Sequence, residues 1–230
     1  MELARHHRQE HASHFLRQQA AWAGMLPSQW AANKLTQVLQ DGTTVTHTSG
    51  ERVCLSTTRP LPPGLDNFYF EITSKATGSD PSDASDISNK ELYTLSWESV
   101  FAPSVVLPSS FQAGRLVALR QARSWGYHGD DGAIFDSESH IQPVSNELQY
   151  RAGDTVGCGV DLATQKMWFT RNGHKLESEF GNVKGRLFPL LGLRDEIEIE
   201  TNFTGPFLWK DDNGERDDVT NEAVKVGSST

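Results

Sequence analysis

The chain has 230 residues, 37% of them hydrophobic, and a formal net charge of −9. A chain of this length buries enough surface for an ordinary hydrophobic core. Its acidic balance argues against a nucleic-acid partner, which requires a basic face. We find no window near the ~18 apolar residues of a membrane span and no secretory signal pattern. Cys54 and Cys158 lack metal-ligand spacing, and two cysteines favour a reducing compartment, the cytoplasm or the nucleus.

The first part of the chain is predicted to be helical. Residues 2–23 contain no glycine or proline, and Gly24 offers a stop signal. His7, His11 and His14 follow the spacing i, i+4, i+7, so they would share one face of this helix. Imidazoles at that spacing can converge on a metal ion. No carboxylate or thiolate stands at a matching position, and a histidine-rich polar face explains the same pattern. We therefore expect no metal and assign residues 1–25 to a helix that precedes the main domain.

From Leu26 onward the pattern changes to short segments in which apolar and polar residues alternate. In TVGCGVDL, residues 155–162, Val156, Cys158 and Val160 share one face with Leu162. The segment KMWFTR runs directly into Asn172-Gly173, the dipeptide typical of a tight hairpin turn with two positive φ angles. Such alternation over many short segments, without helices between them, predicts an antiparallel β-sandwich of two sheets. The clearest of the other segments are 67–72, 91–97 and 196–203.

Two polar segments are predicted to lie outside the regular structure. GSDPSDASDISN, residues 78–89, is rich in serine and aspartate and separates two predicted strands, so we expect a surface insertion. Residues 210–230 are acidic and then small and polar, which is typical of a flexible tail. The main domain is therefore expected to span residues 26–209.

The stretch HGDDG, residues 128–132, permits two interpretations. His128, Asp130 and Asp131 could be metal ligands or an acid–base set. Alternatively, the glycines and aspartates form a tight turn between two strands, with aspartate side chains bonded to the backbone. The other histidines stand isolated, and no nucleophile elbow, phosphate-binding loop or dinucleotide fingerprint is present. We favour the turn, and with it a protein that is not an enzyme and has no cofactor.

The sequence contains FYFEI at 68–72, SWGYHGDDG at 124–132 and GDTVGCGVDL at 153–162. Together with three later motifs, these segments resemble the SPRY domain family. The similarity covers roughly residues 26–209, and within the family it is greatest to the SPRY domain of Ran-binding protein M and its fungal relatives in GID/CTLH ubiquitin-ligase assemblies. The passage 95–123 is longer than in those members and lacks their proline-glycine-tryptophan signature. The three later motifs are MWFTRNG at 167–173, FGNVKGRLFPLLGL at 180–193 and ETNFTGPF at 200–207.

The resemblance implies a β-sandwich of the concanavalin-like jelly-roll type and a non-catalytic protein-interaction module. It implies that loops at one edge hold a short peptide or a folded partner, as in a substrate receptor or scaffold of a ubiquitin ligase. The matching positions here are Arg59-Pro60 and Arg194-Asp195, and Arg115 in the long middle passage could join them. Two other functions stay open: a carbohydrate-binding sandwich and a metal-dependent hydrolase that uses HGDDG.

Overall fold

The computed structural model describes residues 19, 24–32, 34–49, 51, 53–75, 92–99, 123–136, 140–142, 147–193 and 196–209. Three predicted segments fall outside these residues: most of the helix over 2–23 with its histidine face, the insertion at 78–89 and the tail at 210–230. Within the described residues, no helix is both long enough and apolar enough to cross a membrane.

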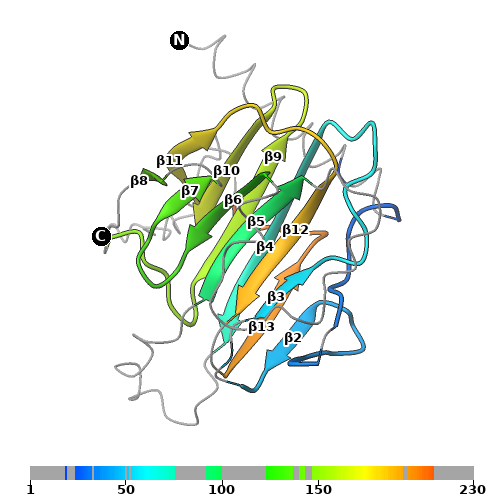
Figure 1. The fold of residues 1–230 in the computed structure, drawn as a ribbon, viewed down its shortest axis with the longest axis vertical. Coiled ribbons are helices and arrows are strands. Elements are labelled where there is room, and N and C mark those ends of the chain that lie inside the picture. Colours follow the sequence, from blue (N-terminus) through cyan, green and yellow to red (C-terminus); the bar gives the residue numbers. More distant parts are fainter. Residues whose placement is uncertain are drawn as a thin grey trace, which may run out of the picture.

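The chain forms two antiparallel sheets, which lie one behind the other in Figure 1. The seven-stranded sheet consists, in spatial order, of β1 (Thr36–Val38), β2 (Thr44–His47), β13 (Ile197–Asn202), β4 (Asn67–Lys75), β9 (Thr155–Asp161), β10 (Lys166–Arg171) and β11 (His174–Phe180). The six-stranded sheet consists of β3 (Val53–Ser56), β12 (Leu187–Leu193), β5 (Leu92–Ser99), β6 (Arg123–His128), β7 (Ile134–Asp136) and β8 (His140–Gln142). The predicted two-sheet antiparallel sandwich is confirmed.

The β10–β11 hairpin turns at Asn172-Gly173, as the sequence predicts. Both residues have positive φ, 49° for Asn172 and 79° for Gly173. The Asn172 side chain accepts a hydrogen bond from the Thr155 backbone at 2.9 Å and donates one to Asp154 at 2.7 Å. The turn is therefore fixed both by its backbone conformation and by a side chain that ties it to the start of β9.

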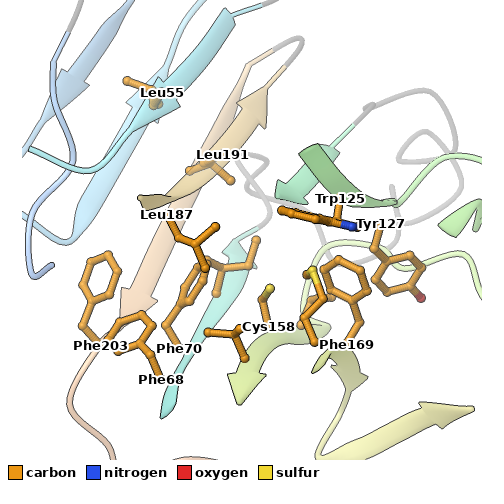
Figure 2. Close-up of a cluster of buried hydrophobic side chains, with 14 of the residues drawn as sticks. Leu55, Phe68, Phe70, Trp125, Tyr127, Cys158, Phe169, Leu187, Leu191 and Phe203 are labelled. Atoms are coloured by element: carbon orange, nitrogen blue, oxygen red, sulfur yellow. The ribbon is translucent and has the colours of Figure 1, made fainter. Parts of the chain in front are cut away.

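The hydrophobic core lies between the two sheets (Figure 2). Alternation along β4 sends Phe68, Phe70 and Ile72 inward, and alternation along β9 does the same for its apolar residues. Residues outside the regular strands also enter the core: Leu26 and Trp30 before β1, and Phe203 after β13. Core contributors from the six-stranded sheet include Leu55, Trp125, Tyr127, Leu187 and Leu191.

Not every strand aromatic lies in this core. Phe169 does, but Trp168, its neighbour along β10, is buried on the opposite face of the seven-stranded sheet. There Trp168 forms a second cluster with Tyr69 and Trp209. Phe188 in β12 is only partly buried. The outer face of the seven-stranded sheet thus carries a hydrophobic layer of its own.

Candidate protein-binding site

The corner that contains Arg59 and Pro60 follows β3 and is fastened along the beginning of β12. The backbone N–H of Thr57 donates to the carbonyl of Pro189 at 3.1 Å, and that of Leu61 donates to Leu187 at 2.9 Å. Within the corner, the Thr57 hydroxyl donates to the Arg59 carbonyl at 2.7 Å. These bonds hold the backbone rigidly, while the Arg59 side chain is exposed and Pro60 is half-buried.

A second arginine lies at the same end of the sheet. Arg186 immediately precedes Leu187, and its guanidinium lies over the Phe188 ring, 5.3 Å from the centroid. The bonds from Thr57 and Leu61 reach Pro189 and Leu187, the two neighbours of Phe188. The Arg186–Phe188 pair therefore lies alongside the Arg59 corner. Sequence reasoning used FGNVKGRLFPLLGL only as a family motif and missed this contact. The signal was an arginine two positions before an aromatic residue, a spacing that brings both side chains to one face of a strand.

The long passage 100–122 is anchored at this end of the six-stranded sheet. Ser99, the last residue of β5, pairs with Leu187 on one side and with Arg123, the first residue of β6, on the other. The passage therefore leaves and re-enters the sheet beside the Arg59 corner. Arg115, which lies within the passage, is outside the described residues.

The other predicted pair, Arg194 and Asp195, is also outside the described residues, but β12, the strand that precedes it, is described. Leu193, the last residue of β12, pairs with Val53 at the start of β3 and with Leu92 at the start of β5. Arg59, by contrast, follows the end of β3. The structure therefore does not bring together the two strand ends from which Arg59 and Arg194 follow, since they lie at opposite ends of β12.

The HGDDG segment forms the connection between β6 and β7. Gly132 has φ 68°, and the Ala133 backbone N–H donates to the Asp131 carboxylate at 2.9 Å, as expected for a tight turn. One ligand atom from each of His128, Asp130 and Asp131 does lie within 4.8 Å of the others. The His128 Nδ1 atom lies 3.4 Å from that carboxylate, and its ring packs on Phe135. A turn with an imidazole–carboxylate contact accounts for the described interactions of these side chains.

The tyrosines beside this turn are suited to structure rather than to proton transfer. The Tyr150 backbone N–H donates to Gly129 at 3.1 Å, and its hydroxyl donates to the Tyr127 carbonyl at 3.2 Å. The Tyr127 hydroxyl donates to the Leu148 carbonyl. Burial raises the pKa of both phenols above the ordinary value of 10.0, so both hydroxyls stay protonated hydrogen-bond donors near neutral pH.

Comparison with known proteins agrees with this architecture. The family model described as SPRY domain matches residues 109–206. Over these residues the chain is similar to the SPRY domain family. Ran-binding protein 9 of Xenopus tropicalis is 29% identical over 164 residues, 70% of this chain and 26% of that protein. Ran-binding protein 10 of Danio rerio is 40% identical over 88 residues, 37% of this chain and 14% of that protein. The similarity to the SPRY domains of Ran-binding proteins is thereby confirmed, and the match spans about a quarter of the Xenopus protein's length.

The fold comparison extends beyond the matched residues. The crystal structure of the SPRY domain of human HERC1 superposes with a TM-score of 0.51, covering 76% of this chain and 95% of that one at 14% sequence identity. At this level of identity the comparison establishes the fold alone. SPRY domains are protein-interaction modules and are generally non-catalytic.

Proposed function

We propose that the domain holds its protein partner at the end of the sandwich marked by Arg59 and Pro60. The observation that carries this proposal is the shared position of an exposed arginine corner, the Arg186–Phe188 pair and the strand ends that anchor the passage 100–122. A rigid sheet there positions connections whose own sequences are free to vary. Arg115, within the passage, is the third proposed contact.

Arginine side chains suit this role chemically. The planar guanidinium presents several donors in a fixed fork, which can hold the carbonyl or carboxylate groups of a peptide. Pro60, half-buried, limits the backbone freedom of the corner and lowers the entropy lost on binding. Arg194 and Asp195 enter the proposal differently. They follow the far end of seven-residue β12, about 20 Å away, so only a folded partner would reach both positions.

We further propose that the protein serves as a substrate receptor or scaffold of a ubiquitin ligase in the cytoplasm or nucleus. The resemblance to Ran-binding protein M and its fungal relatives supports this role. Affinity capture from the source cell with mass spectrometry tests it, because ubiquitin-ligase subunits should be enriched with the tagged protein. Recovery of partners that include no ligase subunit would refute the ligase role and leave the binding function intact.

Two direct assays separate this proposal from the other functions. A glycan array should show no carbohydrate ligand, and metal analysis of the purified protein should show no stoichiometric ion. Sugar binding that resists Arg59→Ala would favour the carbohydrate-binding sandwich instead. A fluorescent fusion tests the compartment, with signal expected in the cytoplasm or nucleus.

A further inference from the structure

The outer face of the seven-stranded sheet is flat around Tyr69. Two glycines of β9 face this side, and neither position has room for a side chain. A Cβ at Gly157 would lie 2.0 Å from the Tyr69 hydroxyl, and one at Gly159 would lie 2.5 Å from the Trp168 ring. The rings of Tyr69 and Trp168 can therefore lie close against the sheet. The Tyr69 hydroxyl is 2.7 Å from the Thr170 hydroxyl, which fixes its position over β10.

After β13 the chain returns across this face of the sheet. We call residues 207–209 the 207–209 strap. Phe207 packs edge-on against the Tyr69 ring at a centroid distance of 5.0 Å. Trp209 packs on Tyr69 at 4.8 Å and on Trp168 at 5.7 Å. Leu208, between them, is 52% exposed. Alternate residues of the strap thus fill the surface around Tyr69.

A buried carboxylate holds the backbone of the strap. Glu71 is 4% exposed, although its position on β4 would otherwise face water. Its carboxylate accepts hydrogen bonds from the backbone N–H groups of Leu208 at 2.9 Å and Trp209 at 2.8 Å. It also accepts one from the Tyr69 hydroxyl at 2.9 Å. Tyr69 therefore orients the group that binds the strap and supplies the ring on which the strap packs.

Gln19, which precedes the domain, binds the backbone of the same residue. The Gln19 carboxamide accepts a hydrogen bond from the Tyr69 backbone N–H at 3.0 Å and donates to the Tyr69 carbonyl at 2.7 Å. It also donates to the Phe203 carbonyl at 3.1 Å. β13 pairs with β4 only from Glu71 onward, so Gln19 completes the backbone bonding of β4 where that partner strand has ended.

We propose that the two segments flanking the sandwich, represented by Gln19 and by the 207–209 strap, are energetically coupled through Tyr69. Each docks on a different part of this one residue, Gln19 on its backbone and the strap on its ring and hydroxyl. Tyr69 stays paired with Gly159 of β9, but loss of either contact loosens it and so weakens the other contact, because coupling between two sites is reciprocal. A partner that displaces one flanking segment therefore weakens the attachment of the other flanking segment to the sheet.

Amide hydrogen exchange resolved by residue tests this coupling in the full chain. In Gln19→Ala we expect exchange at Leu208 and Trp209, which Gln19 does not touch, to rise about fivefold to tenfold, as for the loss of about one hydrogen bond. In Trp209→Ala we expect a similar rise at the Tyr69 amide. The Leu191 amide, in the other sheet, reports global unfolding and is used to normalise the rates.

Asp41→Ala is the matched control, because the Asp41 carboxylate also makes three hydrogen bonds, to Thr43 and Thr44 in the β1–β2 turn. It should leave the rates at Leu208, Trp209 and Tyr69 at their wild-type values. If Gln19→Ala raises exchange at Tyr69 alone and leaves the strap unchanged, the flanks are independent and the proposal is wrong. Phe207→Leu replaces Trp209→Ala should the latter not fold.

Discussion

The Leu61 backbone N–H donates to the Leu187 carbonyl at 2.9 Å, and this bond joins the Arg59 corner to the beginning of β12. The bond has a functional consequence. It places a corner formed early in the chain beside a strand formed late, and it fixes the backbone from which Arg59 projects. The side chains at this end can then vary without disturbing the sheets.

Gly157→Ala should strongly destabilise the fold. The new methyl group would lie 2.0 Å from the Tyr69 hydroxyl and 2.4 Å from the Thr170 hydroxyl, so one of these buried groups must move. Forced overpacking of this kind costs about 1–3 kcal/mol. Urea denaturation measures the loss. Gly181→Ala is the control, because no heavy atom lies within 4 Å of its added Cβ, and it should change stability by less than about 0.5 kcal/mol. Equal stability of the two variants would contradict the packing described around Tyr69.

Asp131→Ala should lower stability by about 1 kcal/mol, because the Ala133 backbone N–H loses its acceptor in the β6–β7 turn. Asp161→Ala is matched to it, since Asp161 likewise accepts one backbone bond, from Thr164 at 2.9 Å, in the β9–β10 turn. We expect similar losses for the two variants in thermal unfolding. Stoichiometric zinc or manganese in the wild-type protein that disappears in His128→Ala would overturn the turn interpretation and favour a metal site.

Asp41 should make stability depend on pH in the acid range. Backbone hydrogen bonds from Thr44 and Thr43 lower the pKa of Asp41 from 3.8 to about 2 in the folded protein. Because the folded pKa is lower than the unfolded one, this stabilisation is complete above about pH 4 and is lost as the pH falls through about 2. Asp41→Asn should remove that part of the pH dependence. Identical acid unfolding curves for the variant and the wild type would show that these bonds contribute nothing.

Arg194→Ala distinguishes the two kinds of partner. Arg59 and Arg194 follow strand ends at opposite ends of β12. For a short peptide held at the Arg59 corner, Arg194→Ala should leave affinity unchanged in a titration by calorimetry. For a folded partner that spans the sandwich, Arg59→Ala and Arg194→Ala should each weaken binding. If Arg194→Ala weakens binding and Arg59→Ala does not, the binding site lies at the end of β12 that precedes Arg194.

The sequence was sufficient for the features that depend on local pattern. Alternation along β9 predicted that Val156, Cys158 and Val160 enter the core, and Asn172-Gly173 predicted the β10–β11 turn. The family motifs supported the sandwich as a whole.

Other features depend on contacts between residues far apart in the chain, and no local pattern contains them. Glu71 has the alternation of a residue that faces water, yet it is buried because the strap crosses it more than a hundred residues later. Gln19 has nothing in its surroundings to indicate a bond to β4. The separation of Arg59 from Arg194 follows from strand register, which sequence alone did not specify.

The central claim is that the Arg59 end of the sandwich holds the partner. Quantitative affinity capture from the source cell, comparing the wild type with Arg59→Ala and Arg151→Ala, tests it most directly. Arg151 is the control because its side chain is also exposed and lies near the HGDDG turn at the opposite end. All three proteins should unfold at the same temperature. We expect Arg151→Ala to retain the proteins enriched on the wild type and Arg59→Ala to lose about tenfold or more of them. Capture of the same proteins at the same level by a folded Arg59→Ala variant would contradict the proposed site.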